Sequence, residues 1–104
     1  MQQQKNLLEN NYKELFILTP VYNDWNAFSL LLSNIEKIAR DNAIVVSVFA
    51  VNDGSAQVFK TKEWKSKFLQ ITRLEILHLS RNLGHQRSIA VGLSALRQRE
   101  EIFT

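Results

Sequence analysis

Short apolar runs alternate along this chain with longer segments of helical periodicity, and this alternation constrains the fold more than any other feature. The apolar runs are Leu15–Thr19, Ile44–Val51 and Leu74–Leu79, and Glu101–Thr104 has the composition of the opening of a fourth strand. The first two runs lack polar alternation, which is typical of strands covered on both faces of a parallel sheet. Pro20 follows the first run, and we expect it to end that strand.

The segments between the apolar runs predict helices. Apolar residues recur at three- and four-residue steps from Trp25 to Ala39, and Asn23 or Asp24 can cap this helix. Weaker patterns predict helices over residues 57–69 and 86–99. Because strands joined by helical crossovers run parallel, we expect an α/β fold. It would be a Rossmann-like parallel sheet with helices on both faces, truncated at the fourth strand.

Composition supports one domain. Of the 104 residues, 45% are hydrophobic, and 3 Gly and 1 Pro leave little room for disordered stretches. We expect residues 1–13 to be a flexible polar leader and residues 14–104 a single domain.

The absence of Cys excludes disulfides, thiolate metal ligands and cysteine nucleophiles. No apolar run approaches the roughly 18 residues of a spanning helix, and no signal peptide begins the chain. We therefore expect a cytoplasmic protein, located at the cytoplasmic face of the membrane if a longer protein carries membrane helices.

The net charge is +3, and one cluster of cations surrounds Trp64. Its members are Lys60, Lys62, Lys65 and Lys67. Such a cluster fits either a nucleic-acid patch or the solvated face of a helix. The intervening Thr, Glu and Ser residues favour the solvated face, so we expect no nucleic-acid partner.

Polar residues collect where the predicted strands end. They lie in Pro20–Asn23, Asn52–Ser55 and Ser80–Gln86. In an open parallel sheet the ligand crevice lies outside the carboxyl ends of the strands. No P-loop, no dinucleotide-binding glycine pattern and no strained serine elbow occurs among them.

Several of these residues have a structural alternative to ligand binding. Gly54 fits a turn that needs an unusual backbone angle, with Asp53 or Ser55 capping a following helix. Asp53 equally suits a hydrogen bond from a ligand N–H or hydroxyl. For Asn23 the helix cap is favoured.

Arg81 fits a phosphate at the next helix's amino end as well as a neighbouring carboxylate. His85 is more typical of a helix start than of an acid, base or ligand, and His78 is expected to be structural. Trp25 fits the core face of its helix, whereas the ring of Tyr22 can stack on a base.

Three ordered motifs resemble the amino-terminal half of family 2 glycosyltransferases with the GT-A fold. They are Phe16–Asn23, Phe49–Ser55 and Leu79–Leu93, and the resemblance spans about residues 15–104. The last motif is most similar to the branch that loads sugars onto polyprenyl phosphates. The family usually has two consecutive acids before Gly-Ser, and here the first is Asn52.

The resemblance implies a nucleotide-sugar site. Pro20 and Tyr22 would lie against the nucleoside, Asp53 would accept a hydrogen bond from the base, and Arg81–Arg87 would close over the nucleotide and its diphosphate. The full set of predicted binding residues is Pro20, Tyr22, Asn23, Asp53, Gly54, Ser55, Arg81, Asn82, Gly84, Gln86 and Arg87.

In the family, a metal-binding Asp-x-Asp and an acceptor-side carboxylate follow the fourth strand. We expect neither a catalytic nor a metal-binding residue in this chain, which alone would be inactive; Mg²⁺ or Mn²⁺ belongs to the full-length enzyme. The implied partners are a nucleotide-diphospho-sugar and an acceptor lipid phosphate or glycan, as in synthesis of cell-envelope polysaccharide. A third implied partner is the carboxyl-terminal part of the enzyme.

Two alternatives from other classes stay open. The chain fits a non-catalytic Rossmann-like binding module, although a receiver domain would need acidic residues where Asn23 and Arg81 stand. It also fits an interaction piece whose open sheet edge is completed by self-association or by another chain.

Overall fold

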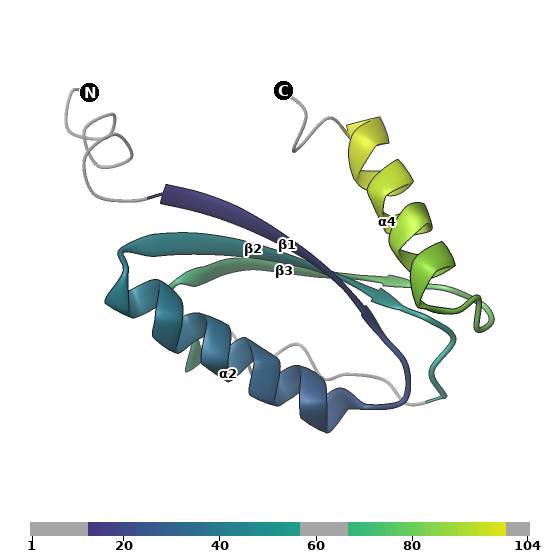
Figure 1. Cartoon of the computed structure of the whole chain (residues 1–104), viewed down its shortest axis with the longest axis horizontal. Helices are drawn as coiled ribbons and strands as arrows, with labels where there is room; N and C mark the ends of the chain where they lie inside the picture. Colours follow the sequence, from purple (N-terminus) through teal and green to yellow (C-terminus); the bar gives the residue numbers. More distant parts are fainter. Residues whose placement is uncertain (1–12, 57–66, 100–104) are drawn as a thin grey trace.

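A computed structural model describes residues 13–56 and 67–99, which form a three-stranded parallel sheet of order β1-β2-β3 with two helices (Figure 1). The elements are β1 (Lys13–Val21), α2 (Trp25–Asp41), β2 (Ile44–Asn52), β3 (Ile71–His78) and α4 (His85–Arg99). The helix predicted over 57–69, apart from its last three residues, and the strand predicted over 101–104 lie outside the described residues. None of the described helices is long and apolar enough to cross a membrane.

The two helices cover opposite faces of the sheet (Figure 1). Helix α2 contacts β2 and β3 on one face, and α4 contacts β1 and β2 on the other. Each face has its own buried cluster. On the α2 side it includes Phe28, Leu32, Val46 and Val48, and on the α4 side it includes Phe49, Val51 and Leu96. The predicted α/β fold, with a Rossmann-like parallel sheet and helices on both faces, is confirmed.

Helix α2 begins at a side-chain cap. The Oδ1 atom of Asp24 accepts a hydrogen bond from the Ala27 N–H at 3.0 Å, so Asp24 rather than Asn23 satisfies the first turn. Trp25 is buried as predicted, and its ring meets Phe28 edge to face at 5.7 Å between centroids. Most of the apolar stripe inferred from the sequence therefore packs on the sheet, although Ile38 of that stripe is 60% exposed.

Strand β1 continues through Pro20 to Val21, so the prediction that Pro20 ends the strand is wrong. The carbonyl of Val21 accepts a hydrogen bond from the Asp53 N–H at 2.7 Å and so points toward the β2 side. Successive residues of a strand turn their backbone groups to opposite sides, so the nitrogen of Pro20 faces the open edge of the sheet. Its missing N–H removes no bond between β1 and β2, and within the described residues β1 is an edge strand.

Strand β3 begins three residues earlier than predicted because a buried carboxylate holds its start. Glu36 of α2 is 3% exposed, and its oxygens accept hydrogen bonds of 2.9 to 3.2 Å from the backbone N–H groups of Leu69, Gln70 and Ile71. Burial raises the pKa of Glu36, but these N–H groups and Arg40 more than offset it, so the pKa lies below its ordinary value. A side chain of α2 thus fixes where β3 starts.

Replacing Glu36 with Gln should destabilise the fold, because one carbonyl oxygen replaces a carboxylate that accepts from three backbone donors. The expected loss in free energy of unfolding is about 2–3 kcal/mol, measured by urea unfolding at neutral pH. The matched control is Arg40→Gln. That change removes an ion pair of 3.3 Å whose guanidinium side is 59% exposed, and it should cost under about 1 kcal/mol. Equal losses in the two variants would contradict the assigned role of Glu36.

Candidate functional site

The loop after β1 is tied to the loop after β2. The backbone N–H of Asn23 donates to Ser55 Oγ at 2.7 Å, and Asn23 Oδ1 accepts from the Ala56 N–H at 3.0 Å. Asn23 has a left-handed backbone with φ of +54°, a conformation that Asn adopts more readily than most residues. The favoured prediction of a helix cap at Asn23 is therefore wrong. Asn23 and Ser55 join two strand ends.

The loop after β2 is tied in turn to the loop after β3 by Asp53. Its side chain is fully buried, and its carboxylate accepts hydrogen bonds from the backbone N–H groups of Leu83 and Gly84. Burial raises its pKa, but the hydrogen bonds, that from Leu83 foremost, hold the pKa below its ordinary value. Because the side chain is fully buried, the predicted contact with a base would require the covering loops to move. The role that the structure gives Asp53 is to hold the β3–α4 loop.

Asn52, where the resembled family usually has an acid, makes two bonds that need both an acceptor and a donor. Its Oδ1 accepts from the Ser55 N–H at 2.9 Å, and its Nδ2 lies 2.9 Å from His78 Nδ1. Because an amide nitrogen only donates, His78 Nδ1 accepts and its ring proton sits on Nε2. A carboxylate at position 52 could accept from Ser55 but has no N–H to donate to His78 Nδ1. His78 is structural, as predicted.

Gly54 marks a place where two loops touch through their backbones. Its φ is +79°, and a Cβ atom built there would lie 2.5 Å from the carbonyl carbon of Arg81 and 2.5 Å from the nitrogen of Asn82. No side chain fits. Gly54, with Asn23, Asp53 and Ser55, therefore belongs to the scaffold of the carboxyl edge.

The remaining predicted residues stay at the surface of that scaffold. Tyr22 is 45% exposed, and four more exposed side chains follow β3. These four are Arg81, Asn82, Gln86 and Arg87. Pro20 and Gly84 are half-buried. The predicted set thus divides into residues that join the loops, of which only Asp53 is fully buried, and exposed residues that a ligand can reach.

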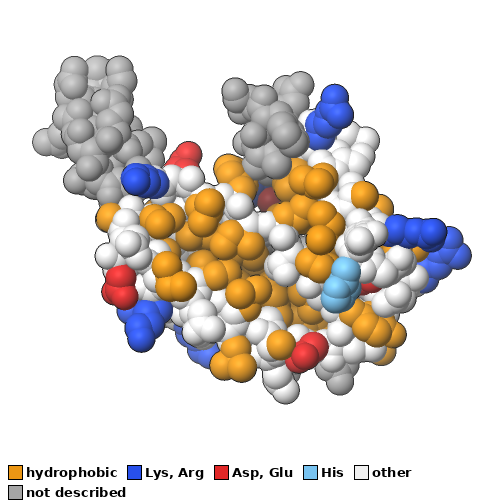
Figure 2. Space-filling view, in the orientation of Figure 1, with side chains coloured by type: hydrophobic (Ala, Val, Ile, Leu, Met, Phe, Trp, Pro, Cys, Tyr) orange, Lys and Arg blue, Asp and Glu red, His pale blue; other side chains and the backbone are white. Residues whose placement is uncertain are grey.

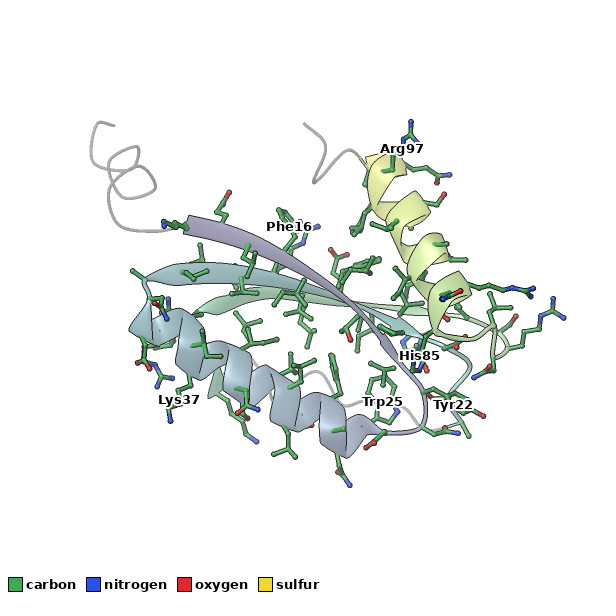
Figure 3. All side chains as sticks on the ribbon, viewed as in Figure 1. Phe16, Tyr22, Trp25, Lys37, His85 and Arg97 are labelled. Atoms are coloured by element: carbon green, nitrogen blue, oxygen red, sulfur yellow. The ribbon has the colours of Figure 1, made fainter. Side chains whose placement is uncertain are left out.

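Two hollows meet at His85, the first residue of α4. One has a volume of about 290 Å³ and is lined by Pro20, Tyr22, Phe28 and Leu31 as well as His85. A second, shallower hollow runs over residues 83–87. Figure 3 shows Tyr22 and His85 at the same end of the sheet, although they come from different elements. His85 begins a helix as predicted, but the sequence analysis does not predict that it lines both hollows. The sequence feature that could have indicated this is its position between two predicted binding residues, Gly84 and Gln86.

Charges of both signs lie around these hollows: Asp24 lines the first hollow, and the buried Asp53 carboxylate accepts from the N–H groups of Leu83 and Gly84 just before α4. The first turn of α4 holds no acidic residue, and its free N–H groups carry the positive end of the helix dipole. Within residues 13–56 and 67–99, Arg81 and Arg87 have no ion-pair partner. Two cations and a helix amino end therefore lie in one segment.

The described part of the chain holds no group of three or more His, Asp or Glu residues placed to bind a metal ion.

Comparisons of the chain with protein-family models, with curated proteins and with solved structures give no match. The resemblance to glycosyltransferases therefore rests on the three sequence motifs alone.

Replacing Gly54 with Ala should destabilise the protein strongly, since the new methyl group meets backbone rather than a movable side chain. The loss should exceed about 2 kcal/mol in thermal or urea unfolding. Gly84→Ala is the matched control. Gly84 also has a positive φ, of +90°, but a Cβ there meets nothing within 4 Å, so backbone strain of about 1–2 kcal/mol is expected alone. A Gly54→Ala protein as stable as the Gly84→Ala protein would contradict the close approach.

Stability should fall with acid because Glu36 and Asp53 both have lowered pKa values in the folded state. Above the unfolded pKa of about 4 both states are ionised and the full stabilisation is present. It is lost as pH falls through the lowered folded values, because the unfolded chain then binds more protons. Urea unfolding between pH 7 and pH 3 measures this slope. In Asp53→Asn, stability at pH 7 should be lower and the slope shallower; an unchanged slope would contradict the role of this carboxylate.

Proposed function

We propose that the chain binds a nucleotide-diphospho-sugar at the carboxyl edge of its sheet, as the nucleotide-binding portion of a glycosyltransferase. The observation that carries the proposal is the cross-linking of three strand-end loops by Asn23, Asp53 and Ser55. This scaffold holds an aromatic ring, two exposed arginines and a helix amino end around hollows that are both lined by His85.

The two hollows suit the two ends of a nucleoside diphosphate. A volume of about 290 Å³ is near the lower end for ligand pockets and suits a base with part of its ribose. The Tyr22 ring at its wall offers a face for stacking. The diphosphate would lie at the start of α4, where backbone N–H groups point outward and Arg81 and Arg87 can form forked, charge-assisted hydrogen bonds.

In the proposed reaction an acceptor oxygen attacks the anomeric carbon of a UDP- or GDP-sugar. The carbon–oxygen bond to the diphosphate breaks, and the nucleoside diphosphate leaves with the electron pair. Arg81, Arg87 and the α4 amino end would neutralise part of the charge that develops on this leaving group.

The remaining parts of this enzyme are proposed from the resemblance. They are Mg²⁺ or Mn²⁺ on an Asp-x-Asp after a fourth strand, and a carboxylate that activates the acceptor. The acceptor would be polyprenyl phosphate or a glycan, reached at the cytoplasmic face of the membrane.

Titration of the isotope-labelled chain with UDP, GDP and inorganic pyrophosphate tests the binding proposal. Amide shifts should move at Tyr22 and at Arg81–Arg87. Arg81→Gln should weaken both UDP and pyrophosphate by about tenfold, because it removes a charge-assisted bond. Tyr22→Ala should weaken UDP and leave pyrophosphate unchanged, since only the nucleotide has a base to stack.

Arg97→Gln serves as the matched control, because Arg97 is an exposed arginine in the last turn of the same helix. Its affinity for UDP should equal that of the unmodified chain. The proposal fails if no nucleotide shifts the amides of Tyr22 or Arg81 in the folded chain at millimolar concentration.

A further inference from the structure

One carboxylate, that of Asp24, lies among the described residues that line the hollow of about 290 Å³ beside Tyr22. The other members of this hollow, which we name the Tyr22 hollow, are apolar side chains and three that carry a hydroxyl or an imidazole, Thr19, Tyr22 and His85. Figure 2 shows an acidic and a histidine side chain bordering hydrophobic side chains on one face of the molecule. The described wall of the Tyr22 hollow is therefore largely apolar and contains a single carboxylate.

The carboxylate of Asp24 is held in place and keeps free acceptor capacity. Its Oδ1 atom accepts from the Ala27 N–H at 3.0 Å as the cap of α2. A carboxylate has about four lone-pair positions on its two oxygens, and this cap uses one of them. Within residues 13–56 and 67–99, no Lys, Arg or His forms an ion pair with Asp24. The helix cap therefore orients a carboxylate that can still accept two hydrogen bonds from a ligand.

Asp53, the acceptor that the resemblance assigns to the base, is engaged elsewhere. Its side chain is fully buried, and its two oxygens accept from backbone N–H groups of the β3–α4 loop. It is also not among the described residues that line the Tyr22 hollow. A base in this hollow would thus meet the carboxylate of Asp24 and not that of Asp53.

A carboxylate discriminates among bases because it only accepts hydrogen bonds. The Watson–Crick edge of guanine carries two adjacent donors, the N1–H and the N2 amino group, which match the two oxygens of a carboxylate. The same edge of uracil carries one donor between two carbonyl oxygens, and adenine and cytosine each set an amino group beside a ring nitrogen that accepts. Those three bases would each place an acceptor against the carboxylate. The hydroxyl and imidazole groups can donate or accept, so they do not decide between bases.

We infer that the Tyr22 hollow selects guanine, with Asp24 accepting hydrogen bonds from N1–H and from the N2 amino group. The ring of Tyr22 stacks on the same base. Asp24 is then the residue that determines nucleotide specificity, and the donor is a GDP-sugar. This inference rests on the proposed nucleotide site and narrows it from UDP or GDP to GDP.

Calorimetric titration of the chain with GDP, inosine diphosphate and UDP tests the inference. Inosine diphosphate differs from GDP only in lacking the N2 amino group. GDP should bind about tenfold tighter than inosine diphosphate, because one charge-assisted hydrogen bond is lost. UDP should bind at least tenfold weaker than GDP, because a uracil carbonyl then faces the carboxylate.

Asp24→Asn separates base selection from helix capping, since Asn caps a helix about as well as Asp does. The amide offers one acceptor and one donor in place of two acceptors, so GDP should weaken by about tenfold and its advantage over inosine diphosphate should disappear. Xanthosine diphosphate carries a carbonyl oxygen in place of the N2 amino group, and it should bind the variant tighter than it binds the unmodified chain. A purely structural role of Asp24 would weaken all four nucleotides alike and would overturn the inference.

The matched control is Asp41→Asn, the same change at the last residue of α2, which is exposed and roughly 25 Å along the helix from Asp24. It should leave all four affinities unchanged. If UDP or inosine diphosphate binds as tightly as GDP, the inference is overturned while the proposed nucleotide site stands. A preference for GDP that survives Asp24→Asn has the same consequence. If none of the four nucleotides binds, the proposed function and the inference fail together.

Discussion

The hydrogen bonds from the Leu83 and Gly84 backbone to the buried carboxylate of Asp53 are the constraint on which the carboxyl edge depends. A buried carboxylate without partners costs several kcal/mol, so its two oxygens require donors at fixed positions. Meeting that requirement brings the β3–α4 loop against Gly54, where only a residue without a side chain allows the approach. The start of α4, and with it Arg81 and Arg87, is placed as a consequence. The chemistry of the exposed residues is therefore set by a residue that a ligand does not reach.

Glu36 and Asp53 play similar parts. Glu36 accepts backbone hydrogen bonds at the start of β3, and Asp53 accepts them from the loop that follows β3. Each carboxylate accepts hydrogen bonds from backbone N–H groups of a neighbouring segment. Glu36 thereby holds the start of β3, and Asp53 holds the loop between β3 and α4. The third strand of this small sheet depends on buried charge as well as on apolar packing.

The sequence predicts the elements well and their polar contacts poorly, for a physical reason. The apolar runs and the three- and four-residue steps report burial, which fixes the strands, α2, α4 and the parallel sheet. The early start of β3 depends on Glu36, more than 30 residues away in the chain, and no local pattern reports such a bond. In the same way, the pattern Asp53-Gly54-Ser55 looks identical in a sequence whether its side chains hold a loop or bind a ligand. That a strand can continue through Pro20 depends on the position of β1 at the edge of the described sheet, which the local sequence does not indicate.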